Sequence, residues 1–391
     1  MFIIYLQNDR QKNTKMLHYL IMKKKTIYYL GIVFSVLMGI LFTVFSVFAL
    51  IPPSLPALKS DSFIPKGIGI SSMEYISIGG VRQWVTIVGQ DITKPVLLYL
   101  HGGPGSPETV WFLEYNYALT KDFVVVLWEQ RGAGKSFTKA VTPESMTIEQ
   151  FILDTHEMTA FLKKRFITPK IYLFGHSWGA MLGMLAAQRY PEDYYAFIAA
   201  GLPVDLKKSE IIGYNWVLSN SIKSGNAQAV TELTQIGMPM NGEYGGGISA
   251  MEVERKWVME MGGAMYGKSA FPILSKVLLF SGAYTLEDKL RYVLGAEFSL
   301  KYLWPSILAL NLKNKVKSLK IPVYILQGTH DYQTPYPAAK EFYQQLKAPV
   351  KKFITFTNSA HWVLLEESQA VYDILTGTVL KNTLPIKKAK K

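Results

Sequence analysis

Six short, almost uninterrupted apolar runs constrain the fold of this chain more than any other feature. Strands that are apolar on both faces are typical of a parallel sheet covered by helices. Segments with helical periodicity separate the runs, and the clearest extends from Thr147 to Phe166, where Thr147 and Gln150 form a capping box. The alternation predicts an α/β fold with a mostly parallel sheet flanked by helices. The runs are PVLLYL at 95, FVVVLW at 123, KIYLF at 170, YAFIAA at 195, IPVYIL at 321 and KFITF at 352.

The order of these elements also predicts the domain organisation. Two strand-like segments, MEYISI and VRQWVTIV, flank Gly79-Gly80 and predict a β-hairpin where the folded domain begins. The alternation stops from about Leu206 to Pro305, which predicts a mainly helical insertion. We therefore expect a core in two parts, 69–204 and 306–380, interrupted by a helical cap at 205–305. Within the cap, Gly242, Gly245, Gly246 and Gly247 form either a lid hinge or a plain surface loop.

The N-terminal region predicts attachment to a membrane. Residues 27–51 carry no charge, and 25 residues in a helix span roughly 37 Å, more than a hydrocarbon core of about 30 Å. Lys23, Lys24 and Lys25 precede this segment. The positive-inside rule then predicts a cytoplasmic segment 1–26, a transmembrane signal anchor 27–51, a linker 52–68 and an extracytoplasmic catalytic domain. The alternative is a signal peptide that starts at Met22 and is cleaved after 47–49, which would release a secreted protein.

The distribution of charge argues against a nucleic-acid partner. The net charge is +13, but residues 1–26 and 381–391 carry +5 each, which leaves only +3 on the body of the chain. Basic ends on a nearly neutral domain fit anionic lipid or an anionic cell-surface polymer better than a nucleic-acid groove, and a solvated basic tail at 381–391 is the simpler explanation of the C-terminal lysines. The chain has no cysteine, so disulfides and thiolate metal sites are excluded.

The pentapeptide Gly175-His176-Ser177-Trp178-Gly179 predicts a serine nucleophile. It follows the run KIYLF directly and precedes a helical segment, AMLGMLAAQRY. A serine at such a sharp strand-to-helix turn adopts a strained backbone, and small residues two before and two after it let neighbouring chain segments pass close by. Its hydroxyl is then exposed above the carboxyl edge of the sheet.

A serine nucleophile needs a base, and six histidines can be compared for that role. Four of them are set aside by their positions. His18 lies before the uncharged segment 27–51 and His101 in a glycine loop, while His156 lies inside a helix and His176 within the pentapeptide. Asp331 follows the run IPVYIL and His361 follows the last run, which matches the chain order Ser, Asp, His. We therefore expect His361 to be the base and Asp331 to orient it, with His330 as a neighbour only.

A glycine loop, His101-Gly102-Gly103-Pro104-Gly105, follows the apolar run PVLLYL at 95. A tetrahedral intermediate needs backbone N–H donors aimed at its oxyanion, and consecutive glycines let the chain approach it closely. We expect the N–H groups of Gly103 and Trp178 to form this oxyanion hole.

Two rival motifs fail at single positions, so neither a nucleotide nor a metal is expected. Gly134-Lys135-Ser136 resembles the end of a phosphate-binding loop, but Glu129 stands where that motif requires glycine. His156-Glu157 begins a zinc-protease motif whose second histidine is replaced by Ala160. No metal or organic cofactor is predicted.

Five motifs together resemble the prolyl iminopeptidase group of α/β-hydrolases. In order along about residues 70–380 they are HGGPG, WEQRGAGKS, GHSWG, GTHDYQTP and SAHW. The resemblance implies a helical cap over the active site and release of N-terminal residues, typically proline, from short peptides or amides. It also implies acidic cap groups that hold the substrate amine, for which Glu232, Glu252, Glu254 and Glu260 are equal candidates.

Two departures from this family limit the expectation about proline. The family usually has aspartate where this chain has Glu129, and glycine where it has His176. We expect a serine hydrolase that cleaves small peptides or amides through an acyl-enzyme. The alternatives are a membrane-anchored esterase or lipase-like hydrolase with the same machinery, and a non-catalytic protein that binds a small ligand.

Overall fold

The computed structural model describes residues 22–24, 28–32, 34–36, 38–39 and 68–383. The chain divides into two units, Met1–Pro53 and Ser54–Lys391. Most of the predicted transmembrane segment 27–51 and most of the linker 52–68 lie outside the described residues, as does 384–391 of the basic tail. The described parts of 22–39 are helical, and no helix among the described residues is long and apolar enough to cross a bilayer.

An eight-stranded sheet forms the centre of the second unit, in the order β1-β2-β4-β3-β5-β6-β7-β8. Pairing is antiparallel between β1 and β2 and between β2 and β4, and parallel elsewhere. The predicted hairpin and all six predicted strands are confirmed. The strands are β1 Ile70–Ile78, β2 Val81–Gly89, β3 Val96–Leu100, β4 Val124–Glu129, β5 Ile171–His176, β6 Tyr194–Ala200, β7 Val323–Gly328 and β8 Lys351–Phe356.

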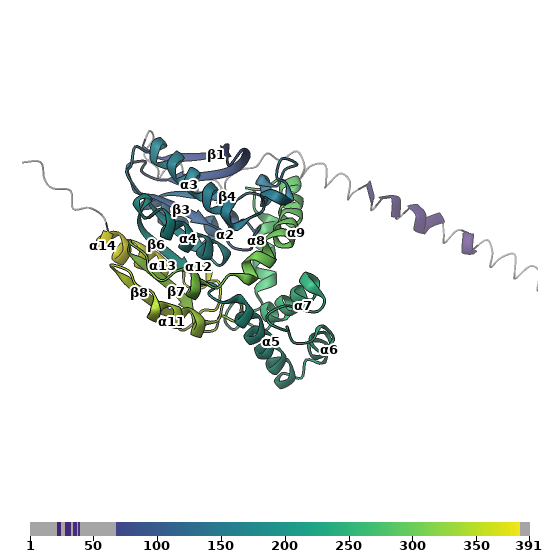
Figure 1. Ribbon diagram of the computed structural model, residues 1–391. Coiled ribbons are helices and arrows are strands. Elements are labelled where there is room, and N and C mark those ends of the chain that lie inside the picture. Colours follow the sequence, from purple (N-terminus) through teal and green to yellow (C-terminus); the bar gives the residue numbers. More distant parts are fainter. Residues whose placement is uncertain (1–21, 25–27, 33, 37, 40–67, 384–391) are drawn as a thin grey trace, which may run out of the picture. The chain divides into compact units, whose positions relative to one another are not determined.

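Helices cover both faces of this sheet (Figure 1). Alternate residues of each central strand point to opposite faces, so Leu98 and Leu173 join one buried cluster while Leu97 and Tyr172 join another. The first cluster includes residues of α3, α4 and α11, and the second includes residues of α2, α12 and α13. These helices are α2 Thr109–Tyr115, α3 Ile148–Arg165, α4 Trp178–Arg189, α11 Tyr336–Gln345, α12 Val363–Glu366 and α13 Ser368–Ile374.

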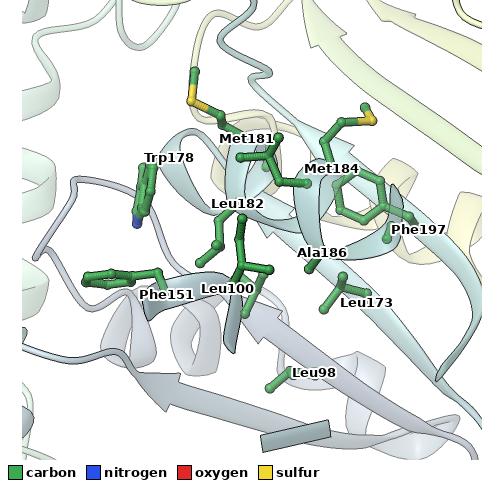
Figure 2. Close-up of a cluster of buried hydrophobic side chains, with 14 of the residues drawn as sticks. Leu98, Leu100, Phe151, Leu173, Trp178, Met181, Leu182, Met184, Ala186 and Phe197 are labelled. Carbon is green, nitrogen blue, oxygen red and sulfur yellow. The ribbon is translucent and has the colours of Figure 1, made fainter. Parts of the chain in front are cut away.

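Helix α4 is packed directly on the strands that precede it (Figure 2). Met181, Leu182 and Ala186 on α4 lie in one cluster with Leu100 and Leu173 of the sheet, and none of these side chains is exposed. Burial of apolar side chains at this density contributes about 1.5–3 kcal/mol for each large residue. The elements on both sides of Ser177 are therefore firmly held.

The predicted helix over 147–166 forms with one change at its start. Thr147 accepts a hydrogen bond from the N–H of Gln150 at 3.1 Å, as a cap should. The predicted capping box is wrong, however, because the Gln150 amide donates to Asp154 at 2.7 Å instead of returning to the cap. Asp154 is a buried carboxylate that also pairs with Arg131 at 2.9 Å, and the Gln150 amide is a further donor to it.

Helices fill the segment between β6 and β7. They are α5 Leu206–Lys223, α6 Ala227–Ile236, α7 Gly247–Glu260, α8 Ala270–Phe280 and α9 Leu286–Ala309, followed by the short α10 Leu312–Lys315. The glycines at 242–246 lie in the connection between α6 and α7. At the C-terminus, the last turns are a π-helical stretch Leu375–Leu380 and α14 Lys381–Thr383, so the first three residues of the predicted tail continue a helix.

Glu129, at the end of β4, connects the core to the start of α9. Its carboxylate accepts hydrogen bonds from the N–H of Lys135 and from the hydroxyl of Tyr284, each at 2.7 Å. Lys135 Nζ donates to the carbonyl of Ala283 at 2.8 Å and lies 3.7 Å from Asp288. Burial raises the pKa of Glu129 to about 7, against the opposing effect of the Lys135 charge and these hydrogen bonds.

We expect Glu129→Gln to change how the stability of the chain depends on pH. The pKa of about 7 lies above the ordinary value of 4.5, so the folded chain holds this proton more tightly than the unfolded chain does. The wild-type free energy of unfolding should therefore fall relative to that of the variant as pH rises from about 4.5 to about 7. Denaturant titrations of both proteins at about pH 5 and about pH 8 measure this difference. A difference that does not change with pH would contradict the prediction.

Candidate active site

Ser177 occupies a strained turn between β5 and α4. Its backbone has φ 52° and ψ −121°, a conformation that non-glycine residues rarely adopt. The two glycines of the motif make this turn sterically possible. A Cβ on Gly175 would lie 2.1 Å from the carbonyl oxygen of Gly179, and a Cβ on Gly179 would lie 2.0 Å from that of Leu100. The turn predicted from the pentapeptide is present, and strain of this kind is typical of functional sites.

Asp331 and His361 form a buried hydrogen-bonded pair. Asp331 follows β7, His361 follows β8, and His361 Nδ1 lies 2.9 Å from Asp331 Oδ2. The other carboxylate oxygen of Asp331 accepts from the N–H groups of Gln333 at 2.9 Å and Thr334 at 2.7 Å. Gln327 Nε2 also donates to Oδ2, at 2.9 Å. The carboxylate is thus fixed by several donors, and one of its oxygens faces the imidazole.

Thr334 is a member of this arrangement that the sequence analysis missed. Its hydroxyl donates to Asp331 Oδ2 at 2.6 Å and lies 3.1 Å from His361 Nδ1. A hydroxyl three residues after a predicted carboxylate is the only sequence signal for it, and such spacing is common in ordinary turns.

The loop that bears His361 lies beside the serine turn. His176, the residue before Ser177, places Nε2 at 3.1 Å from the carbonyl oxygen of His361, and the two rings are 4.8 Å apart. The His361 ring also packs on Gly201, after β6, where an added Cβ would lie 3.0 Å from Nδ1. The three predicted triad residues are therefore gathered at the carboxyl edge of the sheet. His330, in contrast, stacks on Tyr266 with ring centroids 3.8 Å apart.

The segment before α8 holds both of these loops. The N–H of His361 donates to the carbonyl of Ala264, and the N–H of Tyr332 donates to that of Gly263, each at 3.0 Å. The helical insertion thus supports the loops that carry Asp331 and His361.

The glycine loop after β3 approaches Ser177 closely. A Cβ on Gly102 would lie 3.1 Å from Ser177 Cβ and 2.7 Å from Glu108 Oε1, so glycine is required there. The N–H of Gly102 donates to Glu108 Oε1 at 2.9 Å. Within residues 68–383, no acceptor takes the N–H of Gly103 or that of Trp178. Trp178 is the first residue of α4, where N–H groups lack a partner inside the helix and the helix dipole favours negative charge.

Gln130 connects the glycine loop to the serine turn. Its Nε2 donates to the carbonyl of His101 at 3.2 Å, and its Oε1 accepts from Trp178 Nε1 at 3.0 Å. The N–H of Gln130 donates to His101 Nε2 at 3.1 Å, so His101 is neutral with its proton on Nδ1. Burial lowers the pKa of His101 to about 4, which agrees with this tautomer.

The cap contains two buried carboxylates close to the Asp331 loop. Glu210 on α5 and Glu254 on α7 both pair with the guanidinium of Arg255. One oxygen of each carboxylate and the hydroxyl of Tyr244 are buried with no hydrogen-bond partner among the described residues. A Cβ on Gly213 would lie 2.7 Å from Glu254 Oε1 and 2.8 Å from the Tyr332 carbonyl oxygen, which places this carboxylate beside the residue after Asp331.

The structure separates the four cap carboxylates that sequence alone left equal. Glu232 is paired with Lys256 at 2.8 Å, Glu260 accepts from Ser269 at 2.9 Å, and Glu252 is exposed. Of these four, Glu254 alone is buried with an unpaired oxygen. Glu210 was missed, because nothing in the sequence shows that α5 and α7 bring it to the same arginine. Among the described residues, no group of three or more histidine or carboxylate side chains is arranged to hold a metal ion.

Comparisons with known proteins agree with this architecture. The family model described as alpha/beta hydrolase fold matches residues 95–207. The chain is 33% identical over 307 residues to the "Probable aminopeptidase YbaC" of Bacillus subtilis (strain 168), an alignment that covers 78% of this chain and 95% of that protein. It is 25% identical over 310 residues to the proline iminopeptidase of Lactobacillus crispatus (strain ST1), covering 76% of this chain and 94% of the other.

The same arrangement of elements occurs in solved structures. A proline iminopeptidase-related protein from Thermus thermophilus matches with a TM-score of 0.59 at 18% identity, covering 81% of this chain and 99% of that one. At that identity the likeness concerns the fold alone. Taken with the sequence relatives, it leads to one conclusion: the chain belongs to the α/β-hydrolase family and is a hydrolase similar to the proline iminopeptidases.

Proposed function

We propose that this protein is a serine hydrolase that releases N-terminal residues from small peptides or amides. The observation that carries the proposal is the buried hydrogen bond between His361 and Asp331, next to a serine whose backbone is held in a strained turn. This arrangement matches the requirement that a serine nucleophile be activated by an oriented base. The relatives named as aminopeptidases and proline iminopeptidases support amide substrates.

The mechanism follows from the roles of the three side chains. His361 Nε2 takes the proton of the Ser177 hydroxyl as Oγ attacks the substrate carbonyl carbon, and the N–H groups of Gly103 and Trp178 donate to the resulting oxyanion. When the C–N bond breaks, His361 returns the proton to the leaving amine and an acyl-enzyme remains. Water then attacks the ester with His361 as base, which frees the acid product and restores Ser177. Asp331 remains ionised and stabilises the imidazolium.

We further infer that the cap carboxylates select substrates with a free amine. With both carboxylates ionised, Glu210, Glu254 and Arg255 together carry one excess negative charge in a buried site, and the carboxylates leave two acceptor oxygens unpaired. Burial raises the pKa of Glu254 to about 7, against the opposing charge of Arg255. A substrate ammonium bound there would offset the negative charge and occupy the unpaired acceptors, since buried polar groups are costly without partners.

Ser177→Ala and His361→Ala should each lower kcat by about 10³-fold or more, because the members of a triad act as a unit. Folding should persist, as measured by circular dichroism. His330→Ala is the matched control, since this neighbouring histidine stacks on Tyr266 outside the pair, and it should keep near-normal turnover. Labelling by a fluorophosphonate should be lost in Ser177→Ala. Comparable turnover in either triad variant would refute the assignment, and absence of labelling in the wild type would favour a non-catalytic binding protein.

Glu254→Gln should lower kcat/KM for aminoacyl arylamides by about 10- to 100-fold, the range expected for loss of a charged hydrogen bond. Hydrolysis of the same arylamides with an acetylated amine should change little. Glu232→Gln, which alters a partly exposed carboxylate of the same cap that is paired with Lys256, is the control. Equal losses on free and acetylated substrates would contradict amine recognition. Faster wild-type turnover of short acyl esters than of any arylamide would favour the esterase alternative.

We also propose, from the sequence, that residues 27–51 hold the catalytic domain at the outer face of a membrane. The support is the uncharged length of this segment and the three lysines before it. We expect the full chain to stay with membranes during an alkaline carbonate wash and its catalytic domain to be accessible to protease from outside the cell. Release of a soluble, shortened chain would indicate the cleaved signal peptide instead.

A further inference from the structure

A second buried histidine–carboxylate pair lies beneath the serine turn. His176 Nδ1 lies 2.8 Å from Glu108 Oε1, and both side chains are almost completely buried. The other oxygen of Glu108 accepts from the hydroxyl of Tyr99. Neither residue has a role in the mechanism described above, yet burying two charged groups is unfavourable unless they are paired and hydrogen-bonded.

Both ring nitrogens of His176 face oxygen atoms within hydrogen-bond distance. Nδ1 faces Glu108, whose carboxylate already accepts from the N–H of Gly102 and the hydroxyl of Tyr99, which favours its ionised form. Nε2 faces the carbonyl oxygen of His361 at 3.1 Å, which can only accept. Beside an ionised Glu108, a neutral imidazole would leave one nitrogen lone pair directed at an acceptor, so an imidazolium fits this position best. Burial alone would lower the pKa of His176, but the charge and hydrogen bond of Glu108 raise it above the usual value. The pKa of Glu108 is lowered, because the His176 charge and the bonds from His176 and Tyr99 outweigh its burial.

This ion pair joins three segments that are far apart in the sequence. Glu108 Oε1 also accepts from the N–H of Gly102, which precedes the oxyanion donor Gly103. His176 itself precedes Ser177, and its Nε2 holds the main chain of His361. One uninterrupted chain of hydrogen bonds thus connects the oxyanion loop, the nucleophile turn and the loop of the base.

We propose that His176, kept as an imidazolium by Glu108, is a positioning residue that fixes His361 relative to Ser177 and to the oxyanion loop. The role rests on the proposed serine hydrolase function. A protonated ring is suited to it because an imidazolium donates in two directions at once. Glycine, the usual residue here in the family that the motifs resemble, offers no side-chain donor. The charged and titratable groups around His176 are Glu108, His361 and Asp331, with Tyr99 and His101 beyond Glu108.

The protonation state can be measured without any substrate. In the full chain labelled with ¹⁵N-histidine, both His176 ring nitrogens should resonate as protonated nitrogens at about pH 8, where an unperturbed imidazole with a pKa of about 6.5 is neutral. The resonances are assigned by their absence in His176→Gln. An unprotonated ring nitrogen on His176 at that pH would overturn the proposal, whether or not the protein is a hydrolase.

Kinetics test the positioning role. His176→Gln and Glu108→Gln should each lower kcat about 10- to 100-fold with KM nearly unchanged, because small misplacements of catalytic groups have effects of this size. The double variant should be little worse than the poorer single variant, since either change breaks the same chain of hydrogen bonds. Wild-type kcat should also decline at alkaline pH as His176 loses its proton, and His176→Gln should lack that decline.

His156→Gln is the matched control, because His156 pairs with Asp193 at 2.7 Å on the partly exposed side of α3 and should leave kcat unchanged. If His176→Gln and Glu108→Gln lower the thermal stability but keep the wild-type kcat and its decline at alkaline pH, the Glu108–His176 pair is only structural and the proposal is overturned. Failure of fluorophosphonate to label wild-type Ser177 would instead refute the proposed hydrolase function, while the ¹⁵N measurement would still report on the imidazolium.

Discussion

The close contact between α4 and the strands β3 and β5 is the constraint on which the site depends. Ser177 can adopt its strained backbone only because Gly175 and Gly179 allow strand and helix to touch, with carbonyl oxygens where side chains would otherwise lie. The surrounding cluster of buried apolar residues holds this contact in place. The free energy of packing therefore stabilises a local conformation that is unfavourable by itself.

Polar groups beneath the sheet edge are fixed by hydrogen bonds that cross between loops. Gln130 connects the glycine loop to Trp178, Thr334 holds Asp331, and Glu108 with His176 joins the glycine loop to His361. Each loop follows a different strand, so no single element could position the others. A site built in this way is preorganised, which favours catalysis by fixed donors and dipoles rather than by groups that must move.

The inserted helices have two separate roles around this edge. Gly263 and Ala264 support the loops that carry Asp331 and His361, and the link from Glu129 to Tyr284 ties the start of α9 to the core. The buried pair of Glu210 and Glu254 provides unpaired acceptors close to Tyr332. The same insertion therefore supports the site, and under the proposed function it also selects the substrate.

The sequence by itself determined the strands, the serine turn and the order of the three candidate residues, because each depends on local signals. Continuous apolar runs mark buried strands, and two glycines around Ser177 mark a turn that no other residues permit. Only the tertiary structure decided the contacts between distant segments. The Gln150 side chain donates to Asp154 instead of to its helix cap, and Glu210 and Glu254 pair with the same arginine. His176 lies within hydrogen-bond distance of the main-chain carbonyl of His361. These contacts depend on which buried partners the packed helices and loops bring within hydrogen-bond distance. The spacing of residues along the chain does not reveal those partners.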